Sequence, residues 1–452
     1  MKKHLLILLL LGSLVAQAQQ TIDSRQKEIV FTNVSVIPMT SETVLDNQTV
    51  VVKNGVITAI GAKAKYDKNA IVIDAKGKYL MPGLAEMHAH VPPIDDIQPM
   101  KDVLLLFAAN GVTTIRGMLG HPLHLELRSK IKSGEVLGPR LYTSGPSFSG
   151  ASIKTPEEGS EKVRSQKKAG YDFMKMHPGI SKNNFEAIVK TAKEENMPFA
   201  GHVSFGVGVW RSAEAGYATI DHLDGIVEAM MPRIDTLTEA EAGLFGLFVG
   251  HNADVSRLDK ILKTLKDNNV WLVPTQTLAE HWQSPNRTSE QILAWPEMKY
   301  MDKKTLDSWA KAKNSTMQSP QYKPESVLKF IDVRRTIIRE SQRQGVGLLL
   351  GSDAPQVFSV PGFSLKHELN YLVQSGLTPY QALQTGTVNI GKFFKNDNLG
   401  VIKTGAIADL VLLDANPLKD INAVGSIQGV MLDGRWLAKN EIDSVLKKLV
   451  KN

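Results

Sequence analysis

The stretch LMPGLAEMHAHVPP, residues 80–93, decides how this chain is expected to fold. It is an apolar run that is interrupted by Pro82 and Gly83 and that ends in two histidines separated by one alanine. In a strand, side chains alternate between faces, so His88 and His90 point to the same face, about 7 Å apart along the chain. Two imidazoles on one face of a buried strand are either part of a metal site or a coincidence. Further ligand residues elsewhere in the sequence would favour the metal site.

Eight apolar runs with a strand-like composition follow one another through the middle of the chain. They cover residues 84–90, 112–118, 140–145, 171–176, 198–204, 217–223, 270–277 and 346–353. Between most of them lie segments with a helical pattern and a polar face, such as 156–170 and 180–197. Eight strands that alternate with helices predict an α/β fold, the (β/α)8 or TIM-type barrel. A doubly wound open sheet is the alternative, but the chain shows no Gly-rich phosphate loop to favour it.

Short alternating runs of another kind flank this middle part. Val, Ile and Thr dominate residues 29–37, 48–61 and 70–80, and a similar texture returns at 408–417 and 427–438. Alternation with a period of two is typical of antiparallel sheet, and Asn54-Gly55 is a hairpin signal. The pattern predicts a small β-sandwich domain built from both chain ends, residues 19–80 and 399–452, around a barrel of residues 81–398.

The first residues, MKKHLLILLLLGSLVAQAQQ, have a basic start, a leucine-rich centre and a small-x-small ending at Ala16 and Ala18. This pattern predicts a signal peptide over residues 1–18, and therefore export to the periplasm or the extracellular space. The apolar centre is too short for a comfortable membrane anchor, so no membrane span is expected in the mature chain.

Composition excludes several classes of function. The chain has 452 residues, of which 42% are apolar and 22% charged, as in a soluble globular protein. The net charge of +7 comes from scattered residues, so no nucleic-acid partner is expected. The chain contains no cysteine, which excludes disulfides, thiolate chemistry and cysteine–zinc sites.

The chemistry of a barrel takes place at the C-terminal ends of its strands. Polar residues stand at these ends in strands one, four, five, six and eight, and they are His88, His90, Lys175, His202, His222 and Asp353. Each has an ordinary explanation, because a lone histidine is usually structural and Asp-Ala-Pro is good turn chemistry. All six at matching strand ends would need six separate coincidences, so a metal site is predicted.

The pattern as a whole resembles the amidohydrolase superfamily, and within it the imidazolonepropionase-like and prolidase-like branch of metal-dependent hydrolases. The resemblance rests on apolar-Pro-Gly-Leu followed by His-x-His, on the single histidines at later strand ends and on the final Gly-Ser-Asp-Ala. Segments 367–389 and 399–418 also resemble the C-terminal signature of that branch. The similarity extends from about residue 30 to residue 437.

The resemblance implies a binuclear metal centre. His88, His90 and Asp353 would hold one divalent ion, and His202 with His222 would hold a second. Lys175 would be carboxylated by CO2 and would bridge the two ions, since an unmodified ammonium has no lone pair to offer. Imidazole and carboxylate ligands make zinc the expected metal.

The resemblance also implies a reaction. A metal-bound hydroxide would attack an amide carbon, and Asp353 would act as general base and then as general acid in the hydrolysis of a carbon–nitrogen bond. The expected substrate is a dipeptide or an N-acyl amino acid. Two alternatives stay open, namely a mononuclear cyclic-amide hydrolase or deaminase, and a non-catalytic binding protein. A homo-oligomer is also left open.

Candidate substrate contacts are fewer and less specific. Arg116 closes the second strand and could pair with a substrate carboxylate, or else with a residue of the barrel. His121 and His177 could donate to the substrate or be structural. Where dipeptidase-like relatives tend to carry Gly-Gly-His, residues 143–154 read TSGPSFSGASIK, without histidine. The long segment 281–325, with three tryptophans, predicts either a lid or a helical surface insertion.

Overall fold

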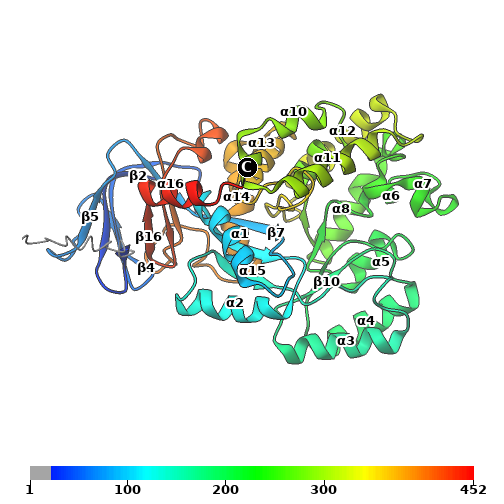
Figure 1. The fold of residues 1–452 in the computed structure, drawn as a ribbon, viewed down its shortest axis with the longest axis horizontal. Coiled ribbons are helices and arrows are strands. Elements are labelled where there is room, and N and C mark those ends of the chain that lie inside the picture. Colours follow the sequence, from blue (N-terminus) through cyan, green and yellow to red (C-terminus); the bar gives the residue numbers. More distant parts are fainter. Residues whose placement is uncertain (1–21, 452) are drawn as a thin grey trace, which may run out of the picture.

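The computed structural model describes residues 22–451, and the predicted signal peptide at 1–18 lies outside the described residues. Within this part of the chain, no helix has both the length and the apolar composition needed to cross a membrane. Two regions are distinct in Figure 1, a β-sheet at one end of the molecule and a larger body of alternating strands and helices beside it. The predicted fold class, a (β/α)8 barrel accompanied by β-structure from both chain ends, is confirmed; the predicted β-sandwich takes the form of one connected nine-stranded sheet.

The barrel consists of short parallel strands that are buried on both faces. They are β7 (Leu84–Ala89), β8 (Val112–Gly117), β9 (Arg140–Thr143), β10 (Met174–Met176), β11 (Phe199–Gly201), β12 (Thr219–Asp221) and β13 (Trp271–Val273). Bridges close the ring between them, because Ser144 pairs with Phe173 and Leu272 pairs with Leu348. Double burial explains why these strands read as nearly continuous apolar runs.

The eighth strand is the least regular, although the segment lies where it was predicted. The amide of Leu349 donates to Leu272 of β13 over 2.9 Å, and the carbonyl of Leu350 accepts from Met87 of β7 over 2.8 Å. Ala354 pairs with Ala89, so this segment joins the last strand to the first. The chain bends sharply at Asp353, whose φ is +63°.

Helices cover the outside of the barrel (Figure 1). The longer ones are α1 (Ile97–Ala109), α2 (Pro122–Ser133), α3 (Pro156–Ala169), α4 (Lys182–Glu194), α5 (Gly208–Ala215), α8 (Leu258–Asp267), α11 (Lys303–Met317), α12 (Pro324–Gln344), α13 (Phe363–Gln374) and α14 (Pro379–Gly386). The shorter ones are α6 (Ile226–Ala229), α7 (Glu239–Ala242), α9 (Gln276–Leu278), α10 (Ser289–Leu293) and α15 (Val388–Phe394). Local sequence sets their limits: α3 begins at a capping box of Thr155 and Glu158 and ends at Gly170, which is left-handed at φ +87°.

The small domain is one connected sheet of nine strands from both ends of the chain. The N-terminal strands are β1 (Ile22–Asp23), β2 (Ile29–Val36), β3 (Leu45–Lys53), β4 (Val56–Gly61), β5 (Ile71–Asp74) and β6 (Tyr79–Pro82); the C-terminal ones are β14 (Leu410–Leu413), β15 (Ile427–Leu432) and β16 (Arg435–Ala438). β6 pairs with β14, and β1 pairs with β16. The last helix, α16 (Lys439–Lys448), packs against α1 of the barrel.

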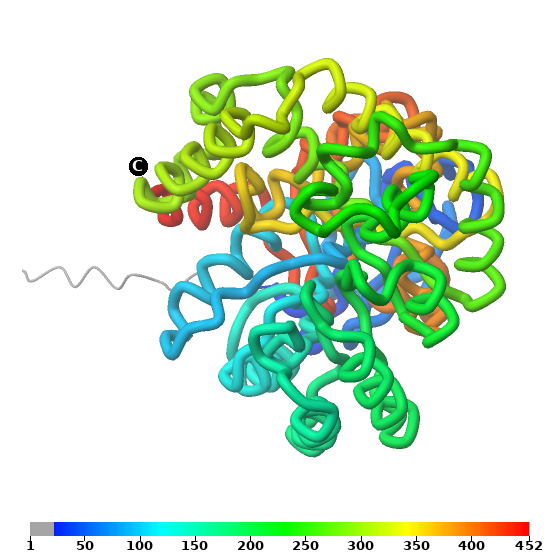
Figure 2. The backbone as a smooth tube through the Cα atoms, turned by 90° about the vertical axis from the view of Figure 1, so that its right-hand side faces the viewer, coloured from blue at the N-terminus to red at the C-terminus, as the bar shows by residue number. Residues whose placement is uncertain are grey.

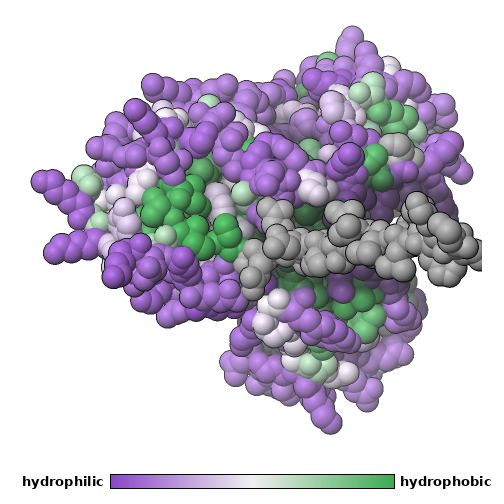
Figure 3. Space-filling model, turned by 60° about the vertical axis from the view of Figure 1, so that its left-hand side comes forward, coloured by the Kyte–Doolittle hydropathy of each residue, from purple (hydrophilic) through white to green (hydrophobic). Residues whose placement is uncertain are grey.

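Each region has its own apolar packing. The sheet contains a cluster that includes Phe31 and Trp436, whose rings meet edge to face with centroids 5.1 Å apart. Apolar patches interrupt the mainly hydrophilic surface on this side of the molecule (Figure 3). The segment after β12, which includes α6 and α7 and is drawn green, lies at the opposite end, away from the sheet (Figure 1 and Figure 2).

Candidate metal centre

The six predicted ligands converge at one end of the barrel. Five of them line a single cavity of about 720 Å3, namely His88, His90, His202, His222 and Asp353. The sixth, Lys175 of β10, has no exposed surface, and its Nζ lies 3.4 Å from Nε2 of His88. Residues separated by up to 265 positions therefore form one cluster because parallel strands end at the same rim.

The tightest group within the cluster is His88, His222 and Asp353. Their potential ligand atoms all lie within 4.8 Å of one another, and all three side chains are buried. His90 is the next partner, with Nε2 2.6 Å from Oδ1 of Asp353. The ring of His202 lies 4.5 Å, centre to centre, from that of His222. The grouping differs from the predicted pairs, since His222 sits as close to His88 as to His202.

Three histidines of the cluster, His88, His202 and His222, are held in the neutral form that a metal ligand needs. Burial, reinforced by the nearby Lys175 cation, holds the pKa of His88 well below its usual range, and it lowers the pKa of His202 to about 3. Burial likewise holds the pKa of His222 well below its usual value. Neutral imidazoles offer lone pairs, and together with the carboxylate of Asp353 they form a donor set that suits zinc or a similar divalent ion.

Two buried atoms beside this group lack the hydrogen bonds that buried polar atoms normally make. Nδ1 of His88 and Oδ2 of Asp221 lie 3.0 Å apart, but neither has a partner in hydrogen-bond geometry. Buried polar groups without partners are rare and need an explanation. A cation that draws the imidazole of His88 into alignment would supply one, so the residues fit the metal that the sequence predicts.

The backbone is strained where it presents these side chains. His222 and Asp353 both have φ +63°, and Thr275 at the end of β13 has φ +46°. Residues other than glycine rarely adopt this region, and such strain collects at functional sites. Thr275 also contributes its hydroxyl, with Oγ1 2.8 Å from Nδ1 of His222, which fixes the orientation of that ring.

Two aspartates of the site escaped the sequence analysis. Asp221 lies beside His88, and its Oδ2 is also 3.8 Å from Nζ of Lys175. Asp224 places Oδ2 3.0 Å from Nδ1 of His202 and accepts the amide of Val203. Carboxylates in these positions orient the imidazoles toward a metal. Their positions in the sequence could have indicated them, because both aspartates flank His222 at the sixth strand end.

A third acid, Glu86, joins the first strand to the eighth. It accepts hydrogen bonds from the amide and the hydroxyl of Ser352, at 2.8 and 2.6 Å, and from the amide of His88 at 3.1 Å. Burial raises the pKa of Glu86 to about 8. Glu86 of the first strand thus holds Ser352, the residue before Asp353, in place.

The role predicted for Arg116 as a substrate contact is corrected by the structure. Its side chain is 2% exposed and is not among the residues that line the cavity. The guanidinium crosses the barrel interior, donating to Thr219 at 2.9 Å, to Asp221 at 3.3 Å and to the carbonyl of Met87 at 2.8 Å. With its donors engaged inside the barrel, Arg116 holds Asp221 in place and cannot reach a ligand at the rim.

The two candidate histidines have different surroundings. His177 lines the cavity, and its ring lies 5.1 Å, centre to centre, from that of His202. His121 does not line the cavity; its ring nitrogen accepts from the amide of Leu123 and caps α2, with Nε2 3.5 Å from Asp95. The structure therefore brings His177, but not His121, to the candidate centre.

The long segment after β13 is largely helical, as one of the two predictions for it stated, and it contributes one side chain to the cavity wall. Trp282 lines the cavity, whereas Trp295 stacks on His367 and Trp309 packs edge to face against Phe358. The buried Lys313 of α11 ties the segment together by donating to three backbone carbonyls, those of residues 281, 282 and 284. Trp282 is thus part of the cavity wall, and Trp295 and Trp309 pack the segment against the rest of the barrel.

Fold and site together define a class of protein, a (β/α)8 barrel with imidazole and carboxylate donors gathered at the C-terminal ends of its strands. A family model agrees with this class. The chain belongs to the amidohydrolase family, whose model matches residues 79–437. The predicted superfamily is confirmed, and hydrolysis of carbon–nitrogen bonds is the activity for which that family is named.

Individual relatives are distant. The chain is 22% identical to an adenine deaminase of Clostridium botulinum over 91% of its own length, and it spans 57% of the length of that relative. It is 21% identical to the ochratoxinase of Aspergillus niger, covering 83% of this chain and 79% of that protein. A solved Xaa-Pro dipeptidase with bound methionine superimposes with a TM-score of 0.64 at 19% identity, covering 91% of this chain and all of that one.

Proposed function

We propose that this protein is a metal-dependent amidohydrolase that cleaves the carbon–nitrogen bond of a dipeptide or an N-acyl amino acid. One observation carries the proposal: the potential ligand atoms of His88, His222 and Asp353 lie within 4.8 Å of one another at the rim of an amidohydrolase-family barrel. The solved dipeptidase with the same fold supports the substrate class.

Two divalent ions, with zinc the expected metal, would be held by the six clustered side chains. His88, His222 and Asp353 form the centre of the site, and His90 and His202 extend it on either side. Bound there, such ions would lower the pKa of a water molecule and polarise the amide carbonyl.

We propose carboxylation for Lys175 because, with divalent ions held by the neighbouring side chains, an anionic oxygen ligand would suit this buried position better than an ammonium ion. It is fully buried beside His88, and burial lowers the pKa of its amine to about 8. A substantial neutral fraction near pH 8 provides the nucleophile that reacts with CO2. Carboxylation replaces a buried cation with an oxygen anion that can ligate a metal.

The remaining chemistry belongs to the side chains of the chain itself. Asp353 lies at the centre of the cluster, 2.6 Å from His90, where it can take a proton from water and deliver it to the leaving nitrogen. His177 lies on the cavity wall, and burial lowers the pKa of its imidazole to about 2, so it is neutral and has one N–H to donate to the substrate. Phe245, Leu278 and Trp282 form apolar walls that limit the access of water.

Deamination is the second candidate, because adenine deaminases are among the relatives that match over most of this chain. The two functions are distinguished by supplying the metal-loaded protein with dipeptides and N-acyl amino acids in one series and with adenine in another. Release of free amino acids supports the amidohydrolase proposal. Release of ammonia from adenine alone would replace it with the second candidate.

The binuclear centre has its own test, the metal content of the purified protein and of a Lys175→Ala variant. Two ions per chain are expected, falling to one or fewer in the variant. Lys190→Ala, which changes an exposed lysine of α4, is the matched control and should keep two. A carbamate carbon signal after exchange with 13C-bicarbonate, absent in Lys175→Ala, would identify the carboxylated lysine. Equal metal content in all three proteins would refute the bridge.

A further inference from the structure

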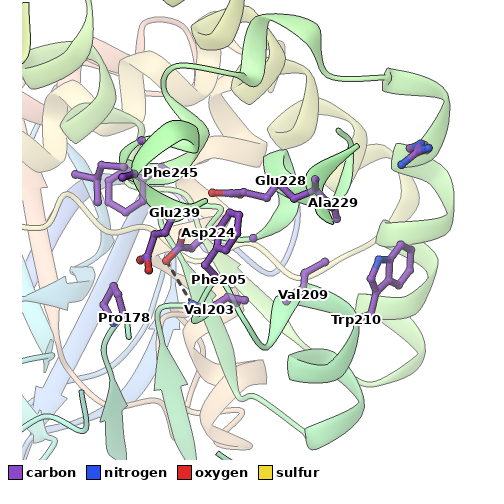
Figure 4. A pocket seen from close by; sticks show the side chains of 17 residues that line it. Pro178, Val203, Phe205, Val209, Trp210, Asp224, Glu228, Ala229, Glu239 and Phe245 are labelled. Carbon is purple, nitrogen blue, oxygen red and sulfur yellow. Dashed lines mark hydrogen bonds between the residues drawn. The ribbon is translucent and has the colours of Figure 1, made fainter. Parts of the chain in front are cut away.

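A second cavity, of about 680 Å3, adjoins the candidate metal centre. The two cavities share the wall residues Pro178, Leu244 and Phe245. The second one lies under the segment after β12, and apolar side chains that include Val203, Phe205, Val209 and Trp210 form much of its surface (Figure 4). Neither the cluster of predicted ligands nor the proposed reaction uses this space.

Three carboxylates interrupt the apolar lining, those of Asp224, Glu228 and Glu239 (Figure 4). Arg257 is the only cation among the described residues that line the cavity. It is engaged elsewhere, because it donates to the carbonyl of Met231 at 2.9 Å and lies 3.6 Å from Asp254. The lining therefore carries three acidic side chains that no lysine or arginine of the described chain pairs with.

Glu228 is the member of this group that is hardest to explain by structure alone. Its side chain lines the cavity although the residue is only 9% exposed, and its Oε2 has no hydrogen-bond partner among the described residues. Burial, reinforced by the nearby Asp224, raises the pKa of the Glu228 carboxyl to about 8. The backbone amides of Gly225 and Glu228 bond to this carboxyl, but a buried oxygen left without a partner still destabilises a fold by about 1–3 kcal/mol unless something else satisfies it.

The cavity borders the metal centre. Oδ2 of Asp224, on its wall, lies 3.0 Å from Nδ1 of His202. Phe245, shared by the two cavities, stacks on His222 with ring centres 4.9 Å apart and planes 22° apart. A substrate that occupied both cavities would therefore lie against Phe245.

We propose that the second cavity is a specificity pocket for an organic cation, an ammonium or guanidinium group on a flexible apolar stem, carried by the amide substrate. The stem would pack on the apolar walls, and the cation would pair with Glu228 and Glu239. The claim that the cation belongs to the substrate rests on the proposed function. The claim that the pocket binds a cation does not.

An alternative explanation assigns the acids a purely structural role. It accounts for Asp224, which orients His202 and accepts the amide of Val203. It also accounts for Glu239, an exposed acid in the first turn of α7, where acids stabilise a helix. It does not account for Oε2 of Glu228, which touches no donor among the described residues. The pocket proposal gives this oxygen a partner and uses Glu239 as a second one.

Binding is tested first, on the metal-loaded protein, by calorimetry with hexylammonium chloride and with its neutral analogue 1-hexanol. The wild type is expected to bind the cation at least tenfold more tightly than the alcohol. Glu228→Gln and Glu239→Gln, which remove charge at constant shape, should each weaken cation binding severalfold. Glu157→Gln, an exposed acid of α3, is the control and should bind like the wild type. Equal affinity for the two probes in the wild type would overturn the proposal.

Turnover is tested second, with dipeptide pairs that contain either lysine or its uncharged analogue norleucine in each position. We expect kcat/KM to favour one lysine isomer by about 30-fold, and Glu228→Gln to reduce this preference about tenfold while norleucine peptides react as before. Because Glu228 is buried, Glu239→Gln serves as a second variant whose folding is not in question. An unchanged preference in both variants contradicts the pocket. Cation binding without hydrolysis of any peptide would instead retain the pocket and refute the proposed function.

Discussion

The rim of the barrel and the nine-stranded sheet are held together by opposite means. The sheet has an apolar centre in which Phe31, Ile29 and Val50 are completely buried, and its strands are joined by backbone ladders with a few irregularities in register. The rim buries charged and polar groups, among them Lys175, Asp221 and Glu86, on strands of only three to six residues. Packing dominates in one region and a polar network dominates in the other.

The difference shows where the molecule can tolerate change. An apolar centre stabilises the fold and is insensitive to pH, whereas a buried polar network is stable only while every partner is in place. Strained backbone at His222 and Asp353 adds to the cost of the rim. Substitutions in the sheet should therefore affect stability without affecting chemistry, whereas substitutions at the rim should affect chemistry and, where they leave a buried charge without its partner, stability as well.

The largest expected effect is on catalysis, at Asp353. Asp353→Asn keeps the shape but removes the charge that lies 2.6 Å from His90 and 3.4 Å from Nε2 of His88. Because both the proton transfer and the metal ligand are lost, kcat/KM for a hydrolysed amide should fall by roughly 10³-fold or more. Thermal unfolding of the metal-free protein should change little. If the Asp353→Asn enzyme stayed active, the cluster at the rim would not be the catalytic site.

The sheet is tested by Phe31→Ala. Phe31 has no exposed surface and packs against Trp436, so the cavity left behind should lower the free energy of unfolding by about 4 kcal/mol. Denaturant unfolding measures the loss, and kcat/KM at a temperature where the variant is folded should match the wild type. A large change in kcat/KM would show that the two regions are not independent.

Inside the barrel, the buried ion pair of Arg116 can be compared with a partly exposed ion pair on the surface. Arg116→Met leaves the buried Asp221 without its partner, and the free energy of unfolding should fall by about 3 kcal/mol. Arg128→Met removes the partly exposed pair with Asp172 and should cost less than about 1 kcal/mol. Chemical unfolding of both variants gives the two values. Similar losses would mean that burial does not set the strength of these pairs.

The smallest expected effect is one of pH, at Glu368, which accepts from the amides of Gln276 and Thr277 behind the rim. Burial raises the pKa of its carboxyl from 4.5 to about 7. The folded state therefore holds this proton more tightly than the unfolded state, and the contribution of Glu368 to stability is present below pH 4.5 and lost as the pH rises through 7. The unfolding free energy of Glu368→Gln relative to wild type should rise by roughly 2 kcal/mol between pH 5 and 8. A flat difference would show that Glu368 does not titrate there.

The residues of the cluster could be predicted because a barrel turns a linear pattern into a spatial one. Each apolar run ends at the rim, so the polar residue that follows it, as with His202 or His222, is placed by its position in the chain alone. The same rule located the eighth strand, although it makes bridges rather than a regular ladder. The sheet was predictable for a similar reason, since alternation identifies strands at both chain ends.

The features that escaped prediction depend on distances across the barrel. Arg116 stands one residue from the end of β8, and nothing in the sequence says that its side chain reaches to β12 rather than to the rim. The second cavity is lined by residues of the irregular segment after β12, where no period exists to be read. Its acids indicate a ligand site only when the structure shows Oε2 of Glu228 buried and without a hydrogen-bond partner beside the metal centre.

The pairing of β1 with β16 places residue 22 beside residue 436. During synthesis on the ribosome, the N-terminal strands emerge long before their C-terminal neighbours exist, so the sheet cannot be completed until almost the whole chain is available. The loop that this pairing closes is among the longest that the chain allows, which makes its closure entropically costly and slow. We therefore expect the barrel to form first and the sheet to assemble late, leaving the edges of β1 and β6, whose partners are β16 and β14, exposed to chaperones in the interval.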